Sequence, residues 1–198
     1  MTVSVLEDWP LENLPLDEKR GTWAMALAIA TEALLFVSLF FAYFYVGRLH
    51  RPWPVEPPKL PLAIVLLIIL LISSATIWAS ERLLSRGSPR AARGLLIVTI
   101  ALGVVFMAVQ ILEYRNHLRE LRPTTDAYGS LFYVVTSFHA LHVVVGLVLL
   151  GFVALLPNLD PDRSPHRPLH NAALYWHFVD VVWVFVVGLI YLLPHWSR

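Results

Sequence analysis

Five long apolar stretches, separated by short polar segments, form the main pattern of the chain. At a rise of about 1.5 Å per residue, about 20 apolar residues in a helix cross the roughly 30 Å hydrocarbon core of a bilayer. The pattern therefore predicts five transmembrane helices, and the last is expected to end at Leu193 because Pro194 follows it. The predicted helices cover residues 22–46, 62–80, 94–112, 130–156 and 173–193.

Prolines and charged residues lie almost entirely between these stretches. The stretches contain none of the 14 prolines, and their only Asp, Glu, Lys or Arg residues are Glu32 and Asp180. Short connectors also make consecutive helices antiparallel. We expect an all-α, up-and-down membrane bundle with a polar tail over 1–21, one five-helix domain over 22–194 and a C-terminal tail over 195–198.

The composition fits a membrane protein and excludes several kinds of site. Hydrophobic residues make up 58% of the chain and charged residues 15%, against about 25% charged in an average soluble domain. The lack of cysteine excludes disulfides, thiolate metal sites and a cysteine nucleophile. A net charge of +1 with scattered basic residues provides no basic patch, so no nucleic-acid partner is expected. Lys and Arg divide almost evenly between the two faces, so charge does not set the orientation.

Five polar side chains inside the apolar stretches are the candidate functional residues: Glu32, His139, His142, His177 and Asp180. A charged group at the centre of a transmembrane helix costs about 2.5–3.5 kcal/mol on insertion scales, so these groups should face protein, water or lipid headgroups. Glu32 has two interpretations. It is either a proton-exchanging or lipid-sensing carboxyl, or a protonated carboxyl that ties two helices together. The tie is favoured because the sequence shows no relay partner.

The histidine spacing raises the question of a haem or metal site. His139 and His142 lie three residues apart on one helix face, and His177 and Asp180 repeat that spacing. A haem held by two histidines needs both at one depth, yet His142 and His177 are expected about 15 Å apart in height. We therefore expect hydrogen-bonded histidines between helices, with Asp180 as a further tie. No catalytic, metal-binding or cofactor-binding residue is expected in this chain.

A polar pair closes the third stretch. Gln110 lies near its end and Glu113 follows directly after it, close to one membrane face. Because charged residues at such positions are normally solvated, Glu113 is interpreted as a terminal charge rather than as part of a site.

Four motifs, in order along about residues 20–194, resemble those of the cytochrome c oxidase subunit III family of haem-copper terminal oxidases. The strongest are Tyr175-Trp176-His177-Phe178-Val179-Asp180-Val181-Val182-Trp183 and Tyr128-Gly129-Ser130-x-Phe132 followed by Thr136-x-Phe138-His139-x-Leu141-His142-Val143-x-x-Gly146. Glu32 in a Phe-rich first helix and Gln110-x-x-Glu113-Tyr114 agree as well. Long family members have seven helices, whereas this chain begins at what would be their third, as the short bacterial members do.

The resemblance implies a non-redox subunit III of a proton-pumping respiratory oxidase that reduces oxygen to water. Haem and copper are then expected in the catalytic partner, subunit I, with subunit II and any small subunits completing the complex. Family members hold structural phospholipid in an interior cleft and help to sustain proton uptake and the working life of the oxidase. The implied location is the bacterial inner (plasma) membrane, with a cytoplasmic N-terminus and a periplasmic or extracellular C-terminus.

Two other functions stay open at this point. Short relatives of the same family serve as accessory subunits of nitric oxide reductase, and the catalytic subunit that co-purifies would separate the two. A stand-alone b-type cytochrome or proton-conducting membrane protein is the alternative from another class, which a visible spectrum of the isolated chain would test. The motifs do not distinguish cytochrome c from quinol as the electron donor.

Overall fold

The computed structural model describes residues 17–50, 53, 60–117, 127–156 and 166–196, and these residues form helices and no strand. Five of the helices are long and apolar enough to cross a membrane, which confirms the all-α, five-helix prediction. In chain order the elements are α1 (Asp17–Leu49), α2 (Leu60–Ser85), α3 (Pro89–His117), α4 (Ala127–Leu155), α5 (His166–Val186), η2 (Val187–Leu192) and α6 (Leu193–Trp196).

Most helices are longer than the apolar stretches that predicted them. α3 covers Pro89–His117 where the pattern predicted 94–112, and α1 begins at Asp17, within the predicted polar tail. The apolar pattern stops at the edge of the hydrocarbon core, but backbone groups near the membrane surface still gain from internal helix hydrogen bonds. The additional turns therefore carry the polar residues on either side of each stretch.

The prediction that Pro194 ends the last helix is wrong. α5 continues through the π-helix η2 into α6, which contains Pro194. The N–H of Leu193 donates to the carbonyl oxygen of Gly188, five residues earlier. In an α-helix the proline ring would clash with the carbonyl four residues before it. The wider π turn changes that register just before Pro194, so the chain stays helical.

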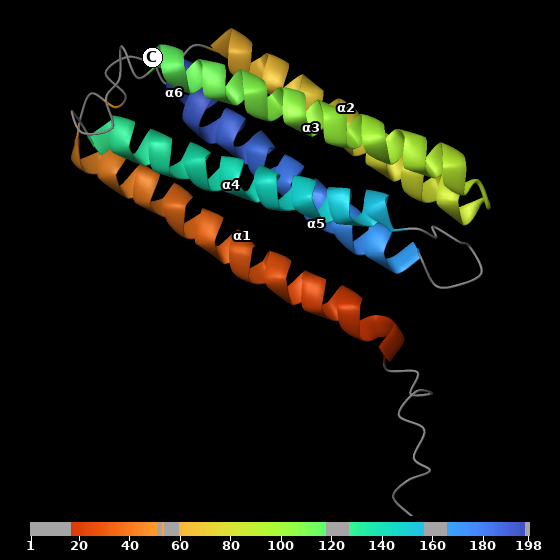
Figure 1. The fold of residues 1–198 in the computed structure, drawn as a ribbon. Coiled ribbons are helices and arrows are strands. Elements are labelled where there is room, and N and C mark those ends of the chain that lie inside the picture. The colour runs from red at the N-terminus through yellow and green to blue at the C-terminus, as the bar shows by residue number, and fades with distance from the viewer. Residues whose placement is uncertain (1–16, 51–52, 54–59, 118–126, 157–165, 197–198) are drawn as a thin grey trace, which may run out of the picture.

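α5 occupies the centre of the bundle. It packs against α1, α2 and α4, while α3 packs against α2 and α4. Figure 1 shows α1 along one edge and the α2–α3 pair along the other, with α5 between them. In the most apolar window of each helix, 56% of the α5 residues are buried but only 6% of the α1 residues. α1 therefore lies at the periphery and contacts α4 and α5 along one side only of its described residues.

A glycine defines the tight turn between α2 and α3. Gly87 has a positive φ of 75°, a conformation that glycine adopts without strain. The N–H of Ser88 donates to the Leu83 carbonyl and the N–H of Gly87 to the Leu84 carbonyl, each at 3.0 Å, as in a Schellman motif. Pro89 then opens α3 at a position where no N–H is needed.

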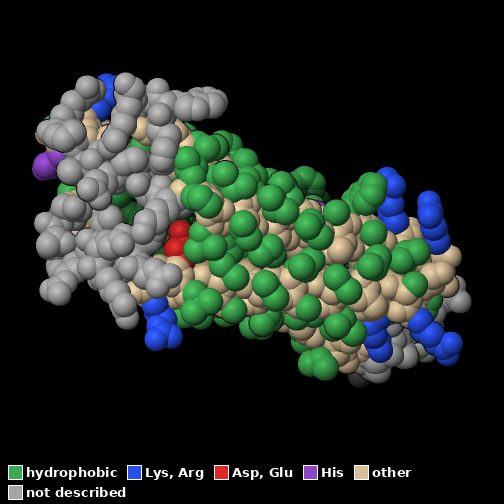
Figure 2. All heavy atoms as spheres, turned by 90° about the horizontal axis from the view of Figure 1, so that it is seen from above, with side chains coloured by type: hydrophobic (Ala, Val, Ile, Leu, Met, Phe, Trp, Pro, Cys, Tyr) green, Lys and Arg blue, Asp and Glu red, His purple; other side chains and the backbone are tan. Residues whose placement is uncertain are grey.

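The outer surface has the polarity expected of a membrane-spanning bundle. Figure 2 shows hydrophobic side chains over the middle of the visible face, with Lys and Arg toward the ends. Many large apolar side chains are exposed at this depth, including Phe41 on α1, Ile68 on α2 and Val148 on α4. An aqueous protein rarely leaves so much contiguous apolar surface uncovered, whereas lipid tails accommodate it.

Trp176 is the central packing residue of α5. It is fully buried, and it lies against Gly103 of α3 and Gly146 of α4. A Cβ atom on Gly103 would come within 2.6 Å of the indole, and one on Gly146 within 2.8 Å. The indole Nε1 also donates to the Ser73 hydroxyl of α2 at 2.9 Å, so the ring has little room to move. Small residues here allow three helices to approach a single tryptophan.

We expect Gly146→Ala to lower the unfolding free energy by about 1–3 kcal/mol, because the added methyl overpacks against Trp176. Gly151→Ala is the matched control on the same helix, since a Cβ there meets no atom within 4 Å. The control should leave stability unchanged or raise it by less than about 1 kcal/mol, through helix propensity. Reversible unfolding in mixed detergent micelles measures both, and equal effects of the two variants would contradict the packing argument.

Candidate functional site

Glu32 of α1 and His142 of α4 form a hydrogen-bonded pair within the membrane-spanning region. Glu32 Oε2 lies 3.1 Å from His142 Nε2, and His142 Nδ1 lies 2.7 Å from the carbonyl oxygen of Phe138. The two residues are 110 positions apart in the sequence. The structure thus supplies a direct partner for Glu32 that the sequence did not reveal.

The hydrogen bonds of His142 restrict where its protons lie. A carbonyl oxygen only accepts, so Nδ1 must carry a hydrogen toward Phe138. Nε2 then either accepts a proton from the Glu32 carboxylic acid or, in the charged ring, donates one to the carboxylate. Both arrangements hold one proton between the two side chains and give the pair a net charge of zero. A neutral pair is the form that low-dielectric surroundings favour.

Aromatic rings enclose the histidine side of this pair. The His142 ring contacts Phe36 at a centroid distance of 4.9 Å and Phe178 at 6.3 Å, and it stacks on Tyr175 at 6.5 Å. The His142 side chain is 9% exposed, but the Glu32 side chain is 40% exposed. The Glu32 carboxyl is therefore only partly covered within this chain, because α1 is peripheral and leaves one side of it open.

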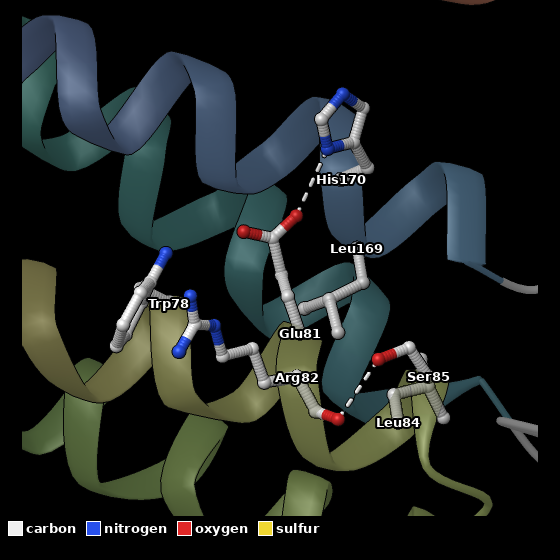
Figure 3. A pocket seen from close by; sticks show the side chains of 7 residues that line it. All are labelled: Trp78, Glu81, Arg82, Leu84, Ser85, Leu169 and His170. Carbon is white, nitrogen blue, oxygen red and sulfur yellow. Dashed lines mark hydrogen bonds and ion pairs between the residues drawn. The ribbon is translucent and has the colours of Figure 1, made fainter.

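A second group of polar residues follows the contact between α2 and α5, and we call it the α2–α5 seam: His170, Glu81, His177, Ser74 and Asp180. His170 Nδ1 lies 2.9 Å from Glu81 Oε1, as Figure 3 shows, and the Ser74 hydroxyl lies 2.6 Å from His177 Nδ1. The Asp180 carboxyl is buried and faces Ser74. Neither of its oxygens has a hydrogen-bond partner among the described residues. Asp180 was expected to tie α5 to a neighbouring helix. It approaches Ser74 of α2 but forms no hydrogen bond with the described residues.

His139 differs from His142 and His177. Its ring stacks on Trp183 of α5 at a centroid distance of 4.8 Å and meets the edge of Phe106 of α3 at 5.8 Å. Within the described part of the chain, neither ring nitrogen has a hydrogen-bond partner. The prediction of hydrogen-bonded interhelical histidines fits the geometry of His142 and His177. It fails for His139, which packs as an aromatic ring.

Glu113 is not the solvated terminal charge that the sequence suggested. Its residue is 2% exposed and Gln110 is equally buried, because α3 continues to His117 and places both inside the bundle. Tyr191, in the π-helix η2, donates a hydrogen bond to Glu113 Oε1 at 3.4 Å. A polar cluster therefore lies where α3 meets the last helical segment.

The arrangement of the histidines does not suit a haem or metal ion. Both ring nitrogens of His142 are engaged, one by a backbone carbonyl and one by Glu32. His177 bonds to Ser74 on a different side of α5 from the His142 contacts, and His139 lies between two aromatic rings. Across the described ranges, no three His, Asp or Glu side chains converge as a metal site would require.

Three functional candidates were missed by sequence reasoning: Ser74, Glu81 and His170. Glu81 and His170 lie outside the predicted helices, and Ser74 was not separated from the apolar residues around it. A usable signal exists, because Ser74 and Glu81 are seven residues apart, as are His170 and His177. When two neighbouring helices are antiparallel, equal spacings allow Ser74 to lie beside His177 while Glu81 lies beside His170.

Comparison with known proteins finds one family. The family model described as cytochrome c oxidase subunit III matches residues 18–197. A protein of Synechocystis sp., named cytochrome c oxidase subunit 3, is 37% identical over 177 residues, which cover 86% of this chain and 75% of the relative. Proteins of the same name from Gallus gallus and Drosophila melanogaster are 35% and 37% identical, covering 88% and 85% of this chain and 70% and 68% of the relatives.

We expect His139→Phe to keep or raise the unfolding free energy and His142→Phe to lower it. The first replaces a buried ring that has no hydrogen bond to the described residues by an apolar ring of similar shape. Removing such an unsatisfied polar group removes a desolvation penalty of about 1–3 kcal/mol. The second leaves the Glu32 carboxyl without its partner, at a cost of similar size. Detergent-unfolding curves of both variants test this order, and a larger loss at His139 than at His142 would contradict it.

Proposed function

Because the chain belongs to the cytochrome c oxidase subunit III family and is a multi-pass subunit of a haem-copper oxidase, we propose that its role there is non-catalytic support. In this role it sustains proton uptake by the catalytic subunit and retains structural phospholipid. Haem and copper then belong to the partner subunit I, and this chain provides no ligand to them. Subunit II and any small subunits complete the assembly.

The observation that carries this proposal is the Glu32–His142 pair. It is a carboxyl at membrane depth that lies 3.1 Å from a histidine ring nitrogen and is still 40% exposed on its own helix bundle. A group of this kind can exchange a proton or bind the polar part of a lipid without creating a net charge.

The family membership also supports a proposal for the cellular setting. We propose the bacterial inner membrane, with the N-terminus in the cytoplasm and the C-terminus in the periplasm. The relatives described above are named as oxidase subunits, which favours an oxidase over a nitric oxide reductase as the parent complex. The identity of the catalytic subunit that co-purifies in mild detergent tests this directly.

We expect Glu32→Gln to leave the haem spectrum of the purified oxidase unchanged, to lower phospholipid retention and to speed inactivation during turnover. The amide keeps the shape of the side chain but removes the proton that it shares with His142. If this weakens lipid binding by about 1.4 kcal/mol, the amount of retained lipid falls up to about tenfold at subsaturating lipid. Absorption spectra, lipid mass spectrometry and the decay of oxygen consumption measure the three effects.

Ser38→Ala is the matched control for this experiment. Ser38 lies on the same helix, and among the described residues its hydroxyl bonds to the Leu34 carbonyl of that helix. It should change none of the three measurements. A shifted Soret band in Glu32→Gln would contradict the non-catalytic role. Unchanged lipid content and unchanged inactivation would leave the carboxyl as a structural tie alone.

A further inference from the structure

A pocket lies at one end of the contact between α2 and α5. Its volume is about 330 Å³, and Trp78, Glu81 and Arg82 of α2 line it together with His170 of α5. Ligand pockets in proteins commonly measure roughly 300–1,000 Å³. Figure 3 shows these side chains around the pocket. Because it lies between the last turns of α2 and the first turns of α5, it is placed where the hydrocarbon meets the polar headgroups.

The guanidinium of Arg82 is held in place, but its hydrogen-bond donors are unused. It lies over the Trp78 ring at 3.5 Å from the centroid. The flat face of the guanidinium makes this contact, whereas its N–H groups point outward in the plane of the group. Among the described residues no carboxylate forms an ion pair with Arg82. Its N–H groups are therefore available to a ligand, and their fork matches the oxygens of a phosphate.

Glu81 places an acceptor beside this donor. Its Oε1 lies 2.9 Å from His170 Nδ1, which holds the carboxyl at the pocket. Its Oε2 has no partner among the described residues, and the side chain is 24% exposed. A carboxylate oxygen only accepts hydrogen bonds, so an ammonium group suits this position. The pocket therefore presents a cation and an anion from consecutive residues, and together the two carry no net charge.

Exposed apolar side chains continue from the pocket toward the middle of the bundle. On α2, Trp78, Leu71 and Ile64 recur every seven residues, so they follow one side of the helix, and all three are exposed. They extend over 14 residues, about 21 Å, whereas one leaflet of hydrocarbon is about 15 Å deep. This length is sufficient for an acyl chain whose headgroup lies in the pocket.

α5 supplies the second side of this apolar surface. The Ser74 hydroxyl lies 2.6 Å from His177 Nδ1, which fixes the relative heights of the two antiparallel helices. Leu71 and Val181 each lie about one turn from this bond, on the side away from the pocket, so they are at nearly the same depth. Val181 is exposed as well. We call these exposed apolar residues the α2–α5 strip: Trp78, Leu71, Ile64 and Val181.

The chemistry of the pocket and the strip identifies the occupant as a zwitterionic phospholipid. Arg82 suits a phosphate, Glu81 suits an ammonium and the strip suits an acyl chain. An anionic lipid would bring a phosphate for Arg82 but no partner for Glu81. A choline lipid carries a quaternary ammonium without an N–H to donate, whereas the primary ammonium of phosphatidylethanolamine has three, as lysine does.

We propose that the pocket and the α2–α5 strip bind one molecule of phosphatidylethanolamine, with its phosphate at Arg82, its ammonium at Glu81 Oε2 and an acyl chain along the strip. The site adds a second position to the phospholipid retention proposed above, and it rests on that role only for its use within the oxidase. It is separate from the Glu32–His142 pair, because that pair joins α1 to α4, whereas this site lies between α2 and α5.

The test uses the full chain in nanodiscs of phosphatidylcholine that contain a trace of phosphatidylethanolamine with a photoreactive diazirine in its acyl chain. Peptides that carry the cross-link, identified by mass spectrometry, should include the segments around Leu71 and Val181. The same probe with a choline headgroup should label these segments about tenfold less, a difference of about 1.4 kcal/mol. Unlabelled phosphatidylethanolamine should displace the probe, whereas equal amounts of phosphatidylglycerol or of soluble phosphorylethanolamine should not.

Two substitutions remove the two headgroup contacts separately. Arg82→Gln removes the phosphate contact and should lower labelling by the ethanolamine probe about tenfold, equivalent to about 1.4 kcal/mol. Glu81→Gln keeps an oxygen for His170 but removes the charge that selects the ammonium, so the ethanolamine probe should label no better than the choline probe. Arg86→Gln is the matched control, because Arg86 lies at the same end of the bundle but does not line the pocket, and it should change neither.

The site is overturned if the two probes label the segments equally in the native chain, or if phosphatidylglycerol or soluble phosphorylethanolamine displaces the probe as well as phosphatidylethanolamine does. Equal losses in Arg82→Gln and Arg86→Gln would also overturn it, since a general attraction to basic residues would then explain the labelling. Glu32→Gln should leave the labelling unchanged, which separates this site from the one proposed above. Because no step requires oxygen reduction, failure of this test leaves the supporting role in the oxidase standing, and failure of that role leaves this test valid.

Discussion

Hydrocarbon offers no hydrogen-bond partner, so every polar group that enters the membrane must find one inside the protein or remain costly. In this chain the contact between α5 and α2 meets part of that demand. On α5, Trp176 bonds to Ser73, His177 to Ser74 and His170 to Glu81, all three on α2. The bonds of Trp176 and His177 lie at nearly one height, and the bond of His170 lies about 10 Å away along the same contact. They determine how α2 and α5 align, and the packing of Trp176 between two glycines then places α3 and α4 around them.

The apolar pattern was sufficient to predict the number, type and order of the helices, because a span of hydrocarbon requires about 20 apolar residues. It could not predict where the helices end. Backbone hydrogen bonding continues past the apolar core, which is why α3 reaches His117 and brings Glu113 inside. Pro194 was misjudged for a related reason. A proline normally interrupts an α-helix, but the π turn before it permits the chain to continue, and no simple sequence pattern predicts such a turn.

The identity of the candidate residues was predictable, but most of their partners were not. Depth counted along the helices would have placed Glu32 and His142 at similar heights. Which helices lie side by side, however, depends on tertiary packing between segments far apart in the chain. The seam was missed because two of its members, Glu81 and His170, lie beyond the apolar stretches. His139 was misjudged because a histidine was assumed to need a hydrogen bond, whereas its ring here stacks on Trp183 as an aromatic side chain would.

The position of α1 has a consequence for how the protein is made. Of the five long helices α1 is synthesised first, yet its packing partners are α4 and α5, the last two of the five to leave the ribosome. During that interval α1 must exist as an independent span, as in the two-stage description of membrane protein folding. Glu32 must then enter the membrane without His142, whereas its helix neighbours Thr31 and Ser38 bond to the backbone of α1 itself. α1 buries the smallest share of its residues in the bundle, so it is the helix that loses least by spanning the membrane alone until α4 and α5 are inserted.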